Sequence, residues 1–284
     1  MTLATRPNRS VLYIPGSKER ALEKARNLPV DAIIFDLEDA VAVDEKARAR
    51  VLLAQTLKSG GYGTRVKLVR VNGFDTEWGR DDVAAFIGAD IDGVLLPKVN
   101  SATDVQQLAD AIPDVAIWAM METSLGILNA VEIAAHPRVA GLVLGTNDLA
   151  KELTCRVRAD REPLLTALQT CLLAARAYGI VCIDGVYNSF RDEEGLRIEC
   201  EQGCDMGFDG KTLIHPAQVA VANQAFAPSQ GEVELARLQI EAFEKAKSAG
   251  QGVAVVNGRI VENLHIVTAL ATLAKADAIS AMED

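Results

Sequence analysis

Short hydrophobic runs recur along the chain and alternate with longer segments in which apolar residues fall at helical spacing. Continuous apolar runs of this length are typical of strands that are buried on both faces, as in a parallel sheet. A helix or a helix-start signal follows each run, as in 18–27, 45–59, 162–178 and 192–202. We expect eight strands, near residues 10–14, 32–35, 65–69, 93–96, 115–121, 141–144, 180–183 and 207–211.

This alternation of eight strands with helices predicts an α/β fold, a closed (β/α)8 TIM barrel, for residues 1–228. A doubly wound sheet is the alternative. It is weakened because no Gly-x-Gly-x-x-Gly sequence follows the first strand. The 284 residues suffice for one large core of this kind.

Residues 229–284 predict a C-terminal helix–hairpin–helix extension. A long helix is expected over 229–249 and an amphipathic helix over 264–279. Between them, Asn257-Gly258 is a strong signal for a hairpin turn. A lone hairpin is only marginally stable in water, so the extension must pack on its own barrel or on another subunit.

Composition and charge mainly exclude certain classes of protein and partner. The chain is 49% hydrophobic and 24% charged, which is ordinary for a globular protein, and its five cysteines do not suggest a disulfide framework. The net charge of −10 argues against nucleic acid or an anionic membrane as the main partner. No apolar run approaches the roughly 20 residues of a membrane span, and the N-terminus lacks a signal-peptide core. We therefore expect a cytoplasmic protein with no membrane partner.

Charged and polar residues follow nearly every predicted strand. The C-terminal ends of barrel strands are where such enzymes keep their chemistry. Loops are polar in any protein, but the recurrence of both signs of charge favours a site. The residues are Ser17, Asp36, Glu38, Asp39, Arg70, Lys98, Glu122, Asp148, Asp184 and His215.

Two of these acids point to a metal. Glu122 and Asp148 each follow one of two consecutive strands, the fifth and the sixth, with no cysteine or histidine beside them. Two carboxylates suit a hard cation such as Mg²⁺. The alternative interpretation is a pair of helix N-caps.

Eight short motifs, in order from the first strand to the eighth, resemble the citrate lyase β-subunit-like family of the HpcH/HpaI aldolase superfamily. That family includes malyl-CoA and citramalyl-CoA lyases. The motifs are RSVLYIPGS (9–17), FDLEDAV (35–41), VRVN (69–72), LLPKV (95–99), METSLG (121–126), LGTNDL (144–149), DGV (184–186) and GKTLIHP (210–216).

The resemblance implies a Mg²⁺-dependent carbon–carbon lyase. Such an enzyme cleaves a malyl-, methylmalyl- or citramalyl-CoA thioester to acetyl- or propionyl-CoA and a small 2-oxo acid. By motif, Glu122 and Asp148 correspond to the metal ligands, for Mg²⁺ with Mn²⁺ able to substitute. Arg70 corresponds to the catalytic residue that contacts the substrate's oxygens. Glu38 and Asp39 could orient metal-bound waters.

The resemblance also implies contacts with the CoA substrate. Lys18 stands where the malyl-CoA lyases have Arg, which keeps the charge but loses the bidentate fork. The positions that correspond to CoA-substrate contacts are Tyr13, Lys18, Lys24, Asn147, Ile214 and His215.

One position departs from the family pattern. The family usually carries an acid–base Asp just after the C-terminal hairpin, where it reaches a neighbouring subunit's site. Here Glu262 takes that place and carries its carboxyl group about one methylene further out. The resemblance therefore predicts Glu262 as a catalytic residue on a lid, in a homotrimer or a dimer of trimers. A solvated charge at the hairpin end is the alternative.

There are three alternatives to the lyase. The first is a malyl-CoA thioesterase on the same scaffold, in which water attacks the thioester. The second is a metal-dependent 2-oxo-acid aldolase that does not use CoA. The third, a non-catalytic relative, is disfavoured because Arg70, Glu122 and Asp148 are all retained.

Overall fold

The computed structural model describes residues 6–283, and the chain divides into two compact units. The first unit comprises Asn8–Phe226, and the second begins at Ala227. The ends of the two predicted domains, residues 1–5 and 284, lie outside the described residues. Each unit is described by itself.

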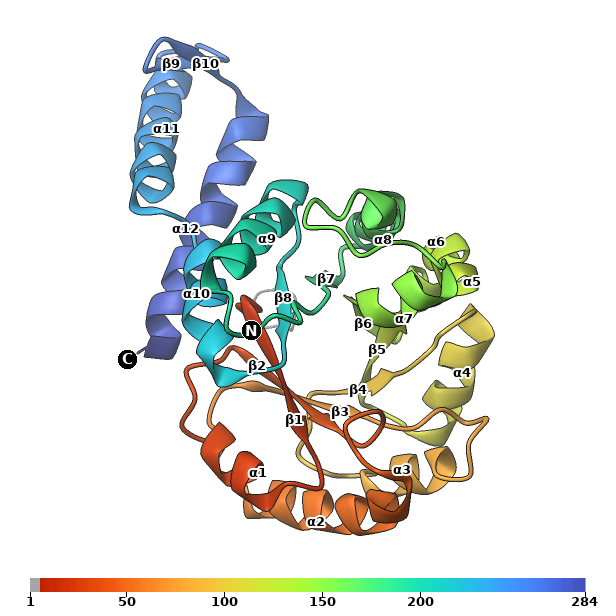
Figure 1. The fold of residues 1–284 in the computed structure, drawn as a ribbon. Coiled ribbons are helices and arrows are strands. Elements are labelled where there is room, and N and C mark those ends of the chain that lie inside the picture. The colour runs from red at the N-terminus through yellow and green to blue at the C-terminus, as the bar shows by residue number, and fades with distance from the viewer. Residues whose placement is uncertain (1–5, 284) are drawn as a thin grey trace. The chain divides into compact units, whose positions relative to one another are not determined.

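The first unit is a closed barrel of eight parallel strands in sequential order, so the expected fold class is confirmed (Figure 1). Strand β1 pairs with β8, with Ser10 opposite Lys211, and this pairing closes the sheet. The strands are β1 (Ser10–Pro15), β2 (Ala32–Asp36), β3 (Val66–Arg70), β4 (Gly93–Leu96), β5 (Ala116–Met121), β6 (Val139–Leu144), β7 (Val181–Asp184) and β8 (Gly210–Leu213).

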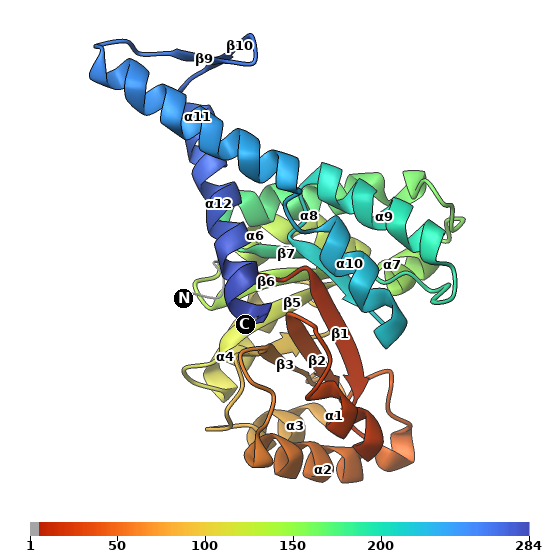
Figure 2. The ribbon, with the colours of Figure 1, turned by 90° about the vertical axis from the view of Figure 1, so that its left-hand side faces the viewer.

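Helices connect successive strands and cover the outside of the barrel. Figures 1 and 2 both show α1, α2 and α3 outside β1, β2 and β3. The helices are α1 (Glu19–Ala25), α2 (Lys46–Ser59), α3 (Gly79–Ala85), α4 (Ala102–Ala111), α5 (Ser124–Leu128), α6 (Ala130–Ala134), α7 (Thr146–Glu152), α8 (Leu165–Tyr178), α9 (Glu193–Met206) and α10 (Val219–Ala225). Short 3-10 turns are η2 (Val43–Glu45), η3 (Glu162–Leu164) and η4 (Pro216–Gln218).

Some local details differ from what the sequence pattern predicts. Strand β8 begins at Gly210, three residues later than the pattern predicts, because Gly207 adopts φ +104° and ends α9. This left-handed conformation is common after a helix, where glycine adopts it without steric cost. Ser17, a favourable residue for an N-cap, does not cap α1. Lys18 holds that position and makes no side-chain capping bond.

The side chains along each strand alternate between two buried environments. On each strand one set of side chains joins the helices in a single hydrophobic core, as Leu12, Ile33 and Val69 do. The intervening residues therefore face the barrel interior, since side chains alternate along a strand. At the C-terminal strand ends, these interior positions are Tyr13, Asp36, Arg70 and Glu122.

Trp118 of β5 faces the barrel interior and is the largest of the fully buried side chains among the described residues. Both neighbouring strands carry a glycine beside it. A Cβ on Gly93 of β4 would lie 2.9 Å from the indole, and a Cβ on Gly141 of β6 would lie 2.5 Å from it. The two glycines therefore provide the space that the indole ring fills.

The second unit is the expected helix–hairpin–helix. It comprises α11 (Gln230–Ser248), a hairpin of β9 (Ala254–Val256) and β10 (Arg259–Val261), and α12 (Asn263–Glu283). A small core of Ala246, Ala254, Val261 and Ile266 joins its four elements. The capping box of Ser229 and Glu232 begins α11.

Helix α12 differs from the expectation that no stretch of the chain is long and apolar enough for a membrane span. Within the described residues, the stretch Asn263–Met282 is long and apolar enough to cross a membrane by length and composition alone. Lys275 and Asp277 lie in that stretch, and Ile266 is buried in the small core of its own unit. An amphipathic helix of a folded unit passes the same test, so this finding is weak evidence for a membrane partner.

We expect the Gly141→Ala variant to unfold at lower denaturant concentration than the parent protein, with a loss of about 1–3 kcal/mol in the free energy of unfolding. The added methyl group would overlap the indole of Trp118. Urea unfolding measures the change, and a second substitution, Trp118→Leu, should restore part of the loss. Gly231→Ala is the control, because nothing lies within 4 Å of a Cβ there. Equal effects at both glycines would contradict this account of the interior.

Candidate active site

A cavity of about 300 Å³ lies among the C-terminal ends of the barrel strands. It is bounded by residues of β1, β2, β3, β5 and β6 and by the segments that follow β6, β7 and β8. Its lining residues are Tyr13, Asp36, Asp39, Ala40, Arg70, Met120, Glu122, Leu144, Gly145, Thr146, Asn147, Asp148, Val186 and Ile214.

Arg70 is the central cation of this cavity and is only 6% exposed. Its Nε and Nη2 atoms donate to the two carboxylate oxygens of Asp36 at 2.7 and 2.6 Å. Its Nη1 atom lies 2.9 Å from Oε2 of Glu38. Burial opposes the charge, but the charge of Asp36 raises the pKa of Arg70 further above its ordinary value. The guanidinium is therefore a fixed positive charge whose orientation is set by two carboxylates.

Tyr13 packs against this cation. The centre of its ring lies 5.0 Å from the guanidinium carbon of Arg70, and its hydroxyl approaches Sδ of Met120 at 3.5 Å. Burial raises the pKa of Tyr13 above its ordinary value, so the ring stays uncharged. A neutral aromatic face on a buried guanidinium stabilises the cation without neutralising it.

Glu122 is 1% exposed and has one unused carboxylate oxygen. Its Oε1 atom accepts a hydrogen bond from the backbone N–H of Lys98 at 2.9 Å, and Oε2 has no hydrogen-bond partner. A Cβ on Gly145 would lie 2.5 Å from Oε2, so only glycine leaves this oxygen its space. Burial and then the nearby charge of Glu38 raise the pKa of Glu122 to about 7.

The cavity fits the predicted Mg²⁺ site. Asp148, in the first turn of α7, lines the same cavity as Glu122 and is only partly exposed. The buried Oε2 of Glu122 is an unpaired anionic ligand of the kind that a hard cation takes. Across residues 6–283, no three His, Cys, Asp or Glu side chains form a complete metal cage. Mg²⁺ commonly binds to one or two protein carboxylates, with water and substrate oxygens at its other positions.

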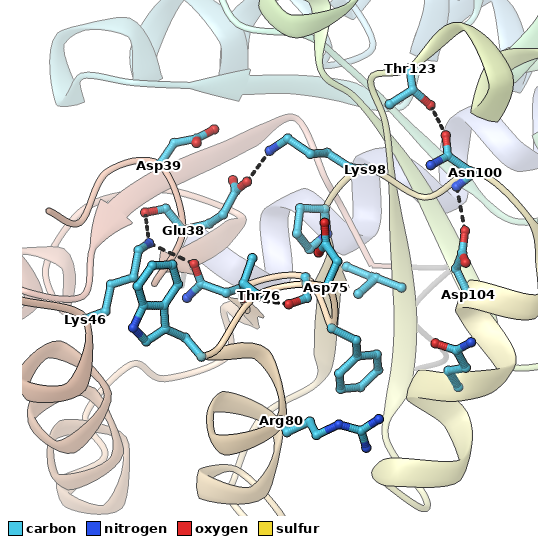
Figure 3. A pocket seen from close by; sticks show the side chains of 17 residues that line it. Glu38, Asp39, Lys46, Asp75, Thr76, Arg80, Lys98, Asn100, Asp104 and Thr123 are labelled. Carbon is cyan, nitrogen blue, oxygen red and sulfur yellow. Dashed lines mark hydrogen bonds and ion pairs between the residues drawn. The ribbon is translucent and has the colours of Figure 1, made fainter. Parts of the chain in front are cut away.

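A larger cavity, of about 810 Å³, adjoins this one at Asp39. Glu38 lines the larger cavity, and Asp39 lines both. Figure 3 shows Glu38 paired with the ammonium group of Lys98, which comes from the end of β4. Burial raises the pKa of Glu38, while the charge of Arg70 acts in the opposite direction.

The other residues predicted to contact substrate lie at the same end of the barrel. Asn147 lines the smaller cavity and exchanges two side-chain hydrogen bonds with Asn188, at 2.7 and 3.2 Å. Ile214 also lines that cavity and is 42% exposed. His215 begins η4 and stacks on Phe190 with ring centroids 4.6 Å apart.

Like His215, three further residues predicted to act at the site do not line the smaller cavity. Lys18, at the N-cap of α1, and Lys24, within α1, are exposed, and the Lys18 ammonium lies 3.7 Å from a carboxylate oxygen of Glu45. Glu262 lies between β10 and α12 in the second unit, where its side chain is exposed. Its backbone N–H donates to Nδ1 of His265 at 3.0 Å.

Asp36 and Lys98 are among the strand-end residues named above, without a role predicted for either, and the structure shows each holding another residue of the site. Asp36 orients Arg70, and the backbone of Lys98 holds Glu122. Both stand in the series of charged residues at strand ends, which is the signal that could have identified them.

Asp184, from the same series, has a structural role instead. It accepts hydrogen bonds from Arg161 at 2.7 Å and from Lys211 at 3.0 Å. Burial raises the pKa of Asp184, but the charges of Lys211 and Arg161 outweigh that effect and hold the pKa below its ordinary value. Both oxygens of this carboxylate are therefore occupied by structural ion pairs.

The closed barrel, with a carboxylate pair and a fixed guanidinium at its C-terminal end, defines an enzyme of a known class. Residues 9–216 match the HpcH/HpaI aldolase/citrate lyase family, and the chain belongs to that family. The citrate lyase β subunit of Escherichia coli is 36% identical over 96% of this chain and 94% of its own.

A solved structure of CitE from Mycobacterium tuberculosis with magnesium, acetoacetate and coenzyme A superposes with a TM-score of 0.82. It is 30% identical and covers 97% of this chain and 100% of that one.

More similar relatives correct the expected activity. Two proteins of Cereibacter sphaeroides strains, 70% and 66% identical over 97% of this chain and 96% of their own, are (3S)-malyl-CoA thioesterases. The expectation of a carbon–carbon lyase is therefore wrong. The motifs do not separate the two activities, because both reactions place negative charge on the oxygen of the same thioester.

We expect the metal-free protein to lose stability as the pH rises from 4.5 to 7. Because the pKa of Glu122 is raised to about 7, the folded state binds more protons than the unfolded state across this window. The loss is on the order of 3 kcal/mol. Urea unfolding at pH 5 and pH 8 in excess chelator measures it.

In Glu122→Gln the same pH change should cost much less, since the amide does not ionise. Glu244→Gln, at an exposed position of α11, is the control and should behave like the parent protein. A Glu122→Gln variant with the parent's pH dependence would show that another group titrates.

Proposed function

We propose that this protein hydrolyses the thioester of (3S)-malyl-CoA to malate and free CoA. The observation that carries the proposal is the 66–70% identity, over 97% of the chain, to relatives of that activity. The site supports it chemically, because a fixed cation and a carboxylate pair surround a cavity of about 300 Å³.

In this proposal Glu122 and Asp148 hold Mg²⁺, and Mn²⁺, which takes the same oxygen ligands, can substitute for it. When bound, the metal acts as a Lewis acid on substrate oxygens and lowers the pKa of a coordinated water. Glu122 supplies its buried Oε2 atom, which has no hydrogen-bond partner among the described residues. Asp148 supplies a second carboxylate at the edge of the same cavity.

Arg70 stabilises the negative charge that develops on the thioester oxygen when water adds to its carbon. Its orientation is set before the substrate arrives, because Asp36 and Glu38 hold three of its nitrogens. Such preorganised charge is usually the largest contribution to catalysis of acyl transfer. Tyr13 covers one face of the guanidinium and limits its hydration.

Hydrolysis also needs an ordered water. Glu38 and Asp39 lie beside Arg70, at the border with the larger cavity. We assign them the role of accepting hydrogen bonds from that water and orienting it toward the thioester carbon. Asp39 is the more accessible of the two, with 59% of its side chain exposed.

The CoA part of the substrate requires local positive charge, because the whole chain carries −10. Lys18 and Lys24, at the N-cap of α1 and within it, are exposed and can meet its phosphates. We place the thioester arm beside Asn147, Ile214 and His215, which follow β6 and β8 at the same end of the barrel.

The products test the proposed reaction. With (3S)-malyl-CoA we expect free thiol and malate in equal amounts, without acetyl-CoA or glyoxylate, and no turnover in excess chelator. Asp148→Ala should stay folded and lose activity by at least a factor of about 10³. Thiol release followed with a chromogenic reagent, together with chromatography of the acids, measures both. Acetyl-CoA with glyoxylate, or full activity in chelator, would refute the proposal.

We further propose that the second unit acts as a lid on another copy of the chain, in a homotrimer or a dimer of trimers. Its exposed apolar side chains support this assignment, because large exposed apolar patches mark interaction surfaces. Glu262 would then donate or accept a proton in the site of the neighbouring copy. The exposed apolar residues are Val253, Val255, Ile260, Leu264, Val267 and Leu270.

Subunit mixing tests the shared site. Glu262→Gln and Asp148→Ala should each be inactive, and a mixture of the two should recover part of the activity after subunit exchange. Some sites would then combine an intact barrel with an intact lid from the other variant. Mass spectrometry of mixed oligomers confirms the exchange. A mixture that exchanges subunits and stays inactive would show that Glu262 is not contributed by a neighbour.

A further inference from the structure

Several polar side chains that line the larger cavity are bound to other groups of the fold. Three of its polar residues are already engaged. The ammonium of Lys46 donates to Oδ1 of Asn72 and to two backbone oxygens, and Oδ2 of Asp104 accepts from two backbone N–H groups (Figure 3). The boundary between this cavity and the active site lies at Asp39, which lines both, and beside it Glu38 and Lys98 line the larger cavity.

Acidic groups are crowded at this boundary. Glu38 and Glu122 lie close enough for their charges to repel, and burial makes that repulsion costly. Arg70 already makes a bidentate pair with Asp36, so it compensates Glu38 only in part. Lys98 supplies the second positive charge, through a direct contact with Oε1 of Glu38.

Lys98 contacts both carboxylates through different parts of one residue. Its backbone N–H donates to Oε1 of Glu122, and its ammonium group binds Glu38. The backbone has φ +50°, a left-handed conformation that is uncommon for residues other than glycine. The backbone is thus held in an unfavourable conformation in which one residue reaches both acids.

We propose that Lys98 is a positioning residue that keeps Glu38 out of the coordination shell of Mg²⁺. This inference rests on the metal site of the proposed function. Glu122 and Asp148 are then the only carboxylate ligands, and the other positions stay available to substrate and water. Glu38, held between Lys98 and Arg70, orients water and does not ligate the metal.

Loss of the ammonium group has a consequence that a purely structural role does not have. Without it, Glu38 keeps only Arg70 as a partner and turns toward the metal as a third carboxylate. A further carboxylate strengthens cation binding but occupies a position that the reaction requires. Lys98→Met should therefore bind Mg²⁺ about tenfold more tightly and show a kcat at least about tenfold lower.

The experiment compares Mg²⁺ dissociation constants from titration calorimetry with kcat and KM for (3S)-malyl-CoA. Lys98→Arg keeps the charge and should lie near the parent protein in both measurements. Lys98→Met with Glu38→Gln should lose the extra affinity, because the third carboxylate is gone. Lys67→Met is the matched control, since it removes a lysine that pairs with the exposed Asp90.

Unchanged or weaker Mg²⁺ binding by a folded Lys98→Met variant would overturn the inference. Tight binding that persists in the double variant would do the same. If Lys98→Met fails to fold, Glu38→Gln alone decides, because a group outside the coordination shell should change the dissociation constant less than about threefold. A parent protein that binds Mg²⁺ and hydrolyses the thioester would keep the proposed function intact in each case. A parent protein that binds no Mg²⁺ would refute both.

Discussion

Closing eight parallel strands into a barrel leaves each side chain only two destinations, the interior and the layer of helices. At the C-terminal ends, the interior positions are Tyr13, Asp36, Arg70 and Glu122, so residues far apart in sequence share one cavity. A charge at such a buried position is costly unless it is paired. Arg70 pairs with the buried carboxylates of Asp36 and Glu38, and the electrostatics of the site depend on this pairing.

Much of this could be predicted from the sequence, because strand ends are visible as the places where apolar runs stop. Arg70, Glu122 and Asp148 were found in this way, and they do line one cavity. The same signal does not show which charges are occupied by ion pairs inside the fold. Asp184 looks equivalent to Glu122 in the sequence, yet Arg161 and Lys211 occupy its oxygens. Those partners lie 23 and 27 residues away, so only the folded structure reveals them.

The activity was harder to predict than the fold for a chemical reason. Cleavage of the carbon chain and hydrolysis of the thioester both need a bound acyl-CoA and a stabilised oxyanion, and Arg70 can serve either. What separates them is whether water reaches the thioester carbon. In the proposed reaction Glu38 and Asp39 orient that water, and their identities are compatible with both reactions. Motifs record residue identity, so they specify the family and leave the reaction open.

The pairing of β1 with β8 also bears on how the protein is made. The codons for Asp36, Arg70, Glu122 and Asp148 are all read before the residues of β8 are synthesised. Until residues 210–213 emerge, β1, an almost wholly apolar strand, has β2 as its only barrel neighbour. An apolar strand with one unpaired edge is a template for aggregation. Closure also joins segments about 200 residues apart, which slows folding. The nascent chain therefore carries its chemical groups long before it has a barrel to protect them.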